Sequence, residues 1–160
     1  MKFRLLISLA LMTFSILTVA NAATSDTLLL RGTVALVNSI QVSPESKAVD
    51  LNILAGESGT KVAAVAETSN NLNGYIIQMS SSNGGQLRHS TEAAKKTTYQ
   101  ISYNGGSYVT PGTSPSTVKS VSSLNALTTN SSNVLINVTA YPTAVAGIYS
   151  DTVTFSIVAN

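Results

Sequence analysis

The sequence predicts an all-β protein, a sandwich or barrel built from about eight short strands. First, the chain is rich in Ser, Thr and Asn but only 10% charged, so it lacks the Glu, Lys, Arg and Gln that usually cover helix surfaces. Second, apolar and polar residues alternate over several short segments, as in strands with one buried face. Third, Asn-Gly and Gly-Gly pairs separate these segments and are typical of tight turns.

The alternating segments give the order of the expected strands. The clearest lie at residues 74–80, 98–103, 133–140 and 153–158, and shorter candidates lie at 40–42, 49–53, 61–68 and 117–121. The strongest hairpin signal joins residues 99–103 to 106–110 through Asn104-Gly105, because both turn residues tolerate a positive φ. Residues 107–117 are expected to form a long surface loop, and residues 91–96 a loop or a single helical turn.

The N-terminus has the three parts of a secretory signal peptide. Lys2 and Arg4 precede an uncharged, largely apolar run at 5–20, which ends in Ala20-Asn21-Ala22. This run is shorter than the ~20 residues that a membrane-spanning helix needs. We therefore expect cleavage after Ala22 and export of a single domain, with no transmembrane segment in the mature chain. The signal peptide carries the surplus positive charge, so the mature chain is neutral and we expect no nucleic-acid partner.

No catalytic or metal-binding pattern stands out. The chain has no Cys, its seven carboxylates are scattered singly, and its single His, His89, is expected in an exposed loop. A catalytic triad would need a base beside a nucleophile and an orienting group, and no such frame is recognisable. We predict that the protein is not an enzyme and binds no cofactor or metal. Tyr108, in the long loop, is the one tyrosine expected to contact a ligand or partner.

Residues 28–37 are the most informative segment. One parity is apolar throughout, interrupted only by a glycine: Leu28, Leu30, Gly32, Val34 and Leu36. Ten extended residues at ~3.3 Å each span roughly 33 Å, which is long for a strand of a globular domain. The segment is the first strand of its own sandwich, a strand donated to a neighbouring molecule, where alternate side chains would fill pockets, or a disordered tail. Its hydrophobicity favours the tail least, because a free apolar strand is an aggregation hazard.

At the C-terminus, the sequence Gly147-Ile148-Tyr149-Ser150-Asp151-Thr152-Val153-Thr154-Phe155-Ser156-Ile157 resembles the G-x-Y-x-D-x-V-x-V ending of bacterial fimbrial subunits assembled by the chaperone–usher pathway. The order of signal peptide, alternating N-terminal strand and Thr/Ser/Asn-rich strands is similar to the spore-coat-U-like and Csu-type pilins, and more distantly to CS1-type subunits. Spore-coat-U-like domains usually carry a disulfide, whereas this chain has no Cys.

The resemblance implies an incomplete immunoglobulin-like sandwich in residues 38–160, completed by a strand from the next subunit. Residues 1–22 would be the signal peptide and residues 23–37 the extension, with the five apolar-parity residues above as donor residues. The last strand, bordering the acceptor groove, would contain Tyr149, Val153, Phe155 and Ile157. The implied partners are identical or related pilin subunits, a periplasmic chaperone and an outer-membrane usher, and the implied location is the cell surface. The alternative is a monomeric secreted sandwich that binds carbohydrate or protein through its loops.

Overall fold

A computed structural model describes residues 24–160, so the predicted signal peptide lies outside the described residues. The chain divides into two units, residues 1–33 and 34–160, and the second is the folded body. Its elements are β1 (Asn38–Pro44), the 3-10 helix η1 (Ser46–Val49), β2 (Glu57–Ser69), β3 (Tyr75–Ser81), β4 (Gln86–His89), β5 (Lys96–Tyr103), β6 (Ser116–Val121), β7 (Thr128–Val138), β8 (Tyr149–Ser150) and β9 (Val153–Ala159). Over residues 24–160, no helix is long and apolar enough to cross a membrane.

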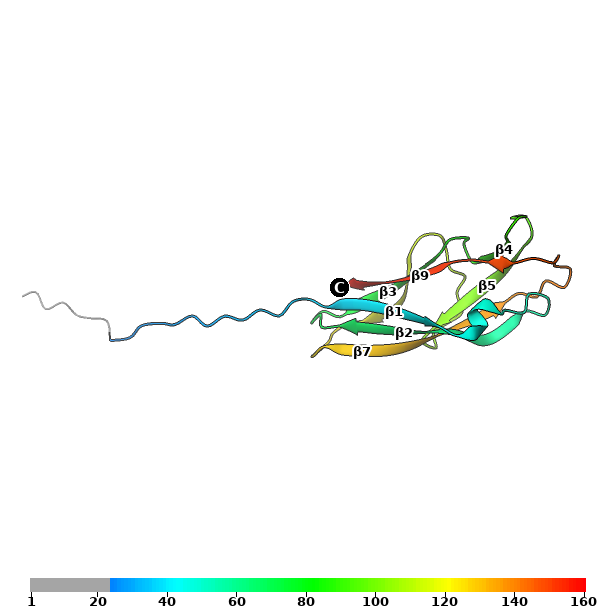
Figure 1. The fold of residues 1–160 in the computed structure, drawn as a ribbon. Helices are drawn as coiled ribbons and strands as arrows, with labels where there is room; N and C mark the ends of the chain where they lie inside the picture. Colours follow the sequence, from blue (N-terminus) through cyan, green and yellow to red (C-terminus); the bar gives the residue numbers. More distant parts are fainter. Residues whose placement is uncertain (1–23) are drawn as a thin grey trace, which may run out of the picture. The chain divides into compact units, whose positions relative to one another are not determined.

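The strands form two antiparallel sheets, which confirms the predicted all-β, immunoglobulin-like sandwich. The larger sheet has six strands in the order β1-β2-β7-β5-β4-β8, and the smaller has three in the order β6-β3-β9. β8 and β9 are neighbours in sequence but belong to different sheets, so the chain changes sheet at Asp151-Thr152. Figure 1 shows the start of β1 and the C-terminus at one end of the body, which we call the base end. The chain that follows β1 forms η1 at the opposite, far end.

Most of the predicted strands are present, and the one at residues 49–53 is wrong. That segment contains the end of η1 followed by a turn. Its polar side chains explain the difference, because Asn52 Oδ1 accepts a hydrogen bond from the Ala55 N–H at 3.0 Å. The Asn52 N–H itself donates to Glu57 Oε1 at 2.8 Å. Such local bonds offer the backbone an alternative to a strand ladder.

The predicted hairpin is confirmed at its turn but not in its second strand. Asn104 and Gly105 both have a positive φ, of 50° and 76°. The returning chain then forms only an isolated bridge between Val109 and Ile101, and β5 instead pairs with β4 and β7. β4 itself was not predicted, because its four residues are too few to show a clear alternation.

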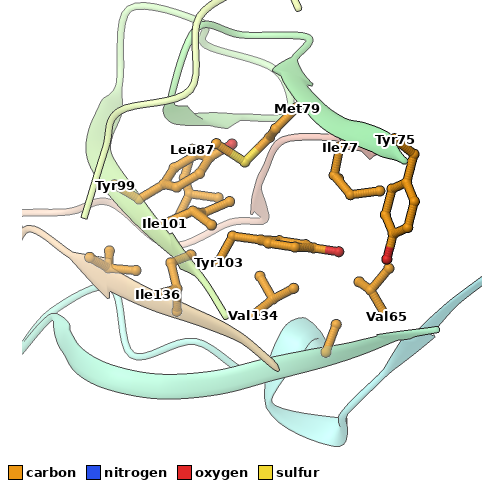
Figure 2. Close-up of a cluster of buried hydrophobic side chains, with 12 residues drawn as sticks. Val65, Tyr75, Ile77, Met79, Leu87, Tyr99, Ile101, Tyr103, Val134 and Ile136 are labelled. Atoms are coloured by element: carbon orange, nitrogen blue, oxygen red, sulfur yellow. The ribbon is translucent and has the colours of Figure 1, made fainter. Parts of the chain in front are cut away.

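The core is filled by alternate residues from β3, β5 and β7. Figure 2 shows these side chains converging between the two sheets. The fully or nearly fully buried members on these strands are Tyr75, Ile77, Met79, Tyr99, Ile101, Tyr103, Val134, Ile136 and Val138. The parity is the one predicted for 74–80, 98–103 and 133–140, so alternation correctly identified the buried face of each strand.

Gly74, directly before β3, has a backbone conformation and a close neighbour that disfavour any side chain. Its φ is +77°, and a Cβ there would lie 1.9 Å from the Val121 carbonyl oxygen. We expect Gly74→Ala to lower the free energy of unfolding by about 2 kcal/mol or more, as measured by urea denaturation. Gly105→Ala is the matched control, because Gly105 has the same backbone angle, +76°, with open space around it. Equal losses in the two variants would show that the close approach at Gly74 contributes nothing.

Candidate functional site

The candidate site is an opening between β1 and β9, which are edge strands of different sheets. β1 pairs only with β2, and β9 pairs only with β3. The two edges approach each other, yet no backbone ladder joins them in the described part of the chain. Each edge therefore keeps one row of N–H and C=O groups available for another strand.

An apolar groove of about 200 Å³ lies at this opening, and the sandwich core forms its floor. The lining is almost entirely apolar, with Asp151 as its one charged residue: Val42, Pro44, Ala48, Leu51, Val62, Ala63, Leu87, Tyr99, Ile101, Val134, Ile136, Asp151, Val153 and Phe155. Figure 2 shows several of these floor residues, among them Leu87, Ile101 and Ile136. The groove thus lies directly over core residues that are themselves nearly fully buried.

The inward-facing side chains of β9 are less buried than those of its neighbour β3. Phe155 lies opposite Met79, and Ile157 lies opposite Ile77, so these paired side chains share the inward face. The β3 members are completely buried, whereas Val153, Phe155 and Ile157 are only half-buried. The inward face of β9 therefore lacks a covering neighbour on its open side.

Tyr149 lies outside the strand that borders the groove. The predicted last strand is broken into β8 and β9, and Tyr149 belongs to β8, where it pairs with His89. It lines a second hollow of about 440 Å³ at the far end, together with Val49 and Ile148. This far-end hollow shares Ala48, Leu51, Leu87 and Asp151 with the groove, so the two lie side by side.

Asp151 fixes the point where the chain changes sheet. Its carboxylate accepts hydrogen bonds from Ser81 Oγ at 2.5 Å and from the Tyr99 hydroxyl at 2.7 Å. It also accepts from the backbone N–H groups of Asn83 and Thr152. Burial raises the pKa of Tyr99, and the bond to Asp151 adds to this, so the hydroxyl stays a donor. Asp151 thereby connects β3 and β5 to the beginning of β9, and it holds one end of the groove in place.

The residues predicted as donors form no strand in this structure. None of residues 24–37 belongs to a strand, and the first strand of the sandwich begins at Asn38. Leu28 and Leu30 are 83% and 82% exposed, and a Cβ at Gly32 would meet nothing within 4 Å. Val34 and Leu36, in the folded body, are exposed as well.

Asn70 holds the root of this segment against the body. Its Oδ1 accepts from the Val37 N–H at 2.7 Å, and its Nδ2 donates to the Ala35 carbonyl at 2.8 Å. The Asn70 N–H also donates to the Val37 carbonyl at 3.2 Å. The backbone is therefore fixed from Ala35 onward, just before β1 begins.

One of the seven carboxylates that are scattered along the sequence lies between the two sheets. Glu67 is completely buried, and Lys119 Nζ donates to its Oε2 at 2.7 Å. The hydroxyls of Tyr75, Tyr103 and Ser132 also donate to its carboxylate. Five strands, β2, β3, β5, β6 and β7, thus meet at one carboxylate.

The hydrogen bonds decide the charge state of Glu67. Burial acts to raise the pKa of this carboxyl, but Lys119 and the three hydroxyls together outweigh it, so the pKa is lowered. Burial, with the neighbouring Glu67 charge, raises the pKa of Tyr103 and of Tyr75. The cluster is therefore a carboxylate surrounded by donors, which suits a structural role and leaves no group free to act as an acid or base.

His89 and Tyr108 are both more enclosed than expected. His89 ends β4, half-buried, with its Nε2 3.1 Å from the Ala146 carbonyl and its ring edge-on to Tyr149. Tyr108 is half-buried beside Gly59. No group of three or more His, Cys, Asp or Glu side chains that could hold a metal occurs in residues 24–160. The other ring nitrogen of His89, Nδ1, lies 3.2 Å from the Thr91 hydroxyl and accepts from the Thr91 and Glu92 N–H groups.

A scan of protein-family models and a search of curated proteins gave no match to this chain.

Proposed function

We propose that this protein is a structural subunit of a bacterial surface fimbria, which polymerises when the N-terminal segment of one copy enters the groove of the next. The observation that carries the proposal is a pair of complementary features in one chain. An apolar groove lies open between the edges of β1 and β9, and the alternating segment 28–37 forms no strand of its own sandwich. A long exposed apolar segment and an open edge are each an aggregation hazard unless they have partners.

Strand donation would satisfy both features at once. The backbone of the incoming segment would pair with the free edges, and its alternate side chains would cover the half-buried Val153, Phe155 and Ile157. Each fully buried Leu or Val would contribute ~1.5–3 kcal/mol. Because a head-to-tail contact does not close on itself, repetition produces an open filament. Adhesion would then be a property of the assembled fibre.

The resemblance of the C-terminal block supplies the rest of the proposal. The chain would be exported by its signal peptide, and a periplasmic chaperone would cover the groove until an outer-membrane usher passes the subunit to the fibre. The neutral mature chain fits a role that depends on backbone pairing and apolar contact rather than on charge.

The test is a pair of substitutions on opposite faces of the segment. Leu30→Asp should abolish polymers, because a carboxylate would enter the apolar groove, and Leu29→Asp should leave polymers intact, because its side chain points away. The readout is the ladder of species that survives SDS at room temperature and collapses on heating. The proposal fails if the unaltered mature chain, residues 23–160, is a stable monomer, or if the two variants polymerise equally.

A further inference from the structure

Two clusters of large apolar side chains on the body line hollows at its two ends. At the base end, Val34, Leu72, Leu124 and Leu127 line a hollow of about 290 Å³, and we call these four residues the base patch. Leu72 and Leu127 in this patch are 71% and 62% exposed. Scattered exposed apolar residues are ordinary, but a cluster around a hollow marks an interaction surface.

The far end carries the second cluster. Val49 and Ile148 are 91% and 70% exposed, and both line the far-end hollow. Leu54 and Val145, also exposed, lie in the neighbouring loops. The far-end hollow shares four lining residues with the groove, so one end of the groove lies beside this cluster.

The root of the N-terminal segment lies in the base patch. Asn70 holds Ala35 and Val37 by three hydrogen bonds, and Val34 itself lines the hollow with Leu72 and Leu127. Gly32 is two residues before Val34, which is a reach of ~7 Å for an extended chain. A neighbour that holds Gly32 in its groove must therefore bring the end of that groove to within ~7 Å of the base patch.

We infer that the base patch of each copy docks on the far end of the next copy, giving the fibre a second, body-to-body interface beside the donated strand. This inference rests on the strand donation proposed above, and its occupant is a second copy of this chain. Because only ~7 Å of extended chain separates Gly32 from Val34, the base patch of one copy must lie against the body of the next. The donated strand is therefore not their whole contact.

The direction in which the N-terminal segment leaves the body identifies the far end of the next copy as the partner of the base patch. The segment leaves the base end, and copies repeated in one orientation present their far end to it. β9 runs from Val153 at the far end to Ala159 beside Tyr75 at the base end. A donated segment that enters with Gly32 at the far end and Leu28 toward the base end therefore runs antiparallel to β9. It continues the antiparallel pairing of β6, β3 and β9.

The test uses the absence of cysteine from this chain. Polymers of the Leu72→Cys/Ile148→Cys variant, treated with a short bismaleimide, should give covalent ladders that survive boiling in SDS. The control is Leu72→Cys/Ser116→Cys, because Ser116 is exposed on β6 but does not line the far-end hollow. The ladder yield of Leu72→Cys/Ile148→Cys should be several times that of this control. Equal yields would overturn the inference. Covalent dimers from Leu72→Cys alone would also overturn it, since they would mean that base ends meet each other.

A second variant separates this interface from strand donation. Leu72→Asn/Leu127→Asn leaves the groove and residues 28–33 unchanged, so polymers that resist SDS should still form. In electron micrographs these fibres should bend more, with a persistence length several times shorter than that of the unaltered fibre. Unchanged stiffness would contradict the body-to-body interface, whereas failure of the unaltered chain to polymerise would instead contradict the proposed function.

Discussion

Replacing Glu67 with Gln is expected to lower the free energy of unfolding by about 3 kcal/mol. The substitution removes a completely buried negative charge and leaves Lys119 without its counter-charge. Three hydroxyl donors also lose a charged acceptor. Urea denaturation of a polymerisation-deficient chain, for example one that carries Leu30→Asp, measures the change without interference from assembly.

Glu45→Gln is the matched control for burial. The Lys61–Glu45 pair is 2.8 Å long, almost the same as the Lys119–Glu67 pair, but both of its side chains are roughly half exposed. Water screens such a pair, so its loss should cost less than about 1 kcal/mol. Similar losses from Glu45→Gln and Glu67→Gln would mean that the buried cluster contributes no more than a surface ion pair.

Glu67 also predicts how stability depends on pH. Its pKa is lower in the folded protein than in the unfolded chain, so its stabilising contribution is fully present above the ordinary value of 4.5. The contribution is lost as the pH falls from there through the lowered pKa, because the unfolded chain binds the proton first. Between pH 5 and strongly acidic solution, the unaltered protein should lose more stability than Glu67→Gln. Parallel pH profiles would contradict this assignment.

Adding a second copy of residues 24–37 after Asn160 is expected to raise the melting temperature by more than 10 °C. Burial of the apolar side chains Leu28 and Leu30 at ~1.5–3 kcal/mol each, together with the added row of backbone hydrogen bonds, gives several kcal/mol, and each kcal/mol is worth roughly 3–5 °C in a domain of this size. The geometry favours the fusion, because β9 ends at the base end and residues 24–27 of the added copy are long enough to return the chain antiparallel to it.

The control for this fusion keeps its length and changes one face. The native residues 23–33 are deleted from every version, so the added copy is the sole segment that can fill the groove. A fusion whose added copy has Asp in place of its Leu30 should melt like the unfused protein, and one with Asp in place of its Leu29 should keep the gain. Calorimetry gives both values. A gain that is independent of which face is changed would show that the added strand does not enter the groove.

The fold class and the buried faces could be predicted because alternation is a local property. Tyr75, Ile77 and Met79 share one parity in the sequence and one face in the structure. The same reasoning could have identified Glu67, which shares its parity with the buried Ala63 and Val65 on β2. A carboxylate on the inward face of a strand is a signal of a buried polar cluster, although its partners come from strands far away in the sequence.

The groove could not be predicted from residue patterns alone. It exists because β1 and β9 are both edges, and strand order is decided by contacts between distant segments. The role of Asn70 is equally hidden, because an Asn between a strand and a turn is ordinary, and its bonds to Ala35 and Val37 span more than thirty residues of chain. The break between β8 and β9 likewise depends on the hydrogen bonds that Ser81 and Tyr99, both distant in sequence, donate to Asp151.

The bonds at Asn70 decide how a fibre of this kind would carry mechanical load. Tension along the segment reaches the body at Ala35 and Val37 and then passes into β1, which is paired with β2 from Asn38↔Ser69 to Pro44↔Ala63. A pull along the strand axis loads this ladder in shear, so its hydrogen bonds resist together and do not open one after another. The hydrogen bonds of Asn70 to Ala35 and Val37 would break first under force and release a few ångströms of chain before the sandwich itself is strained.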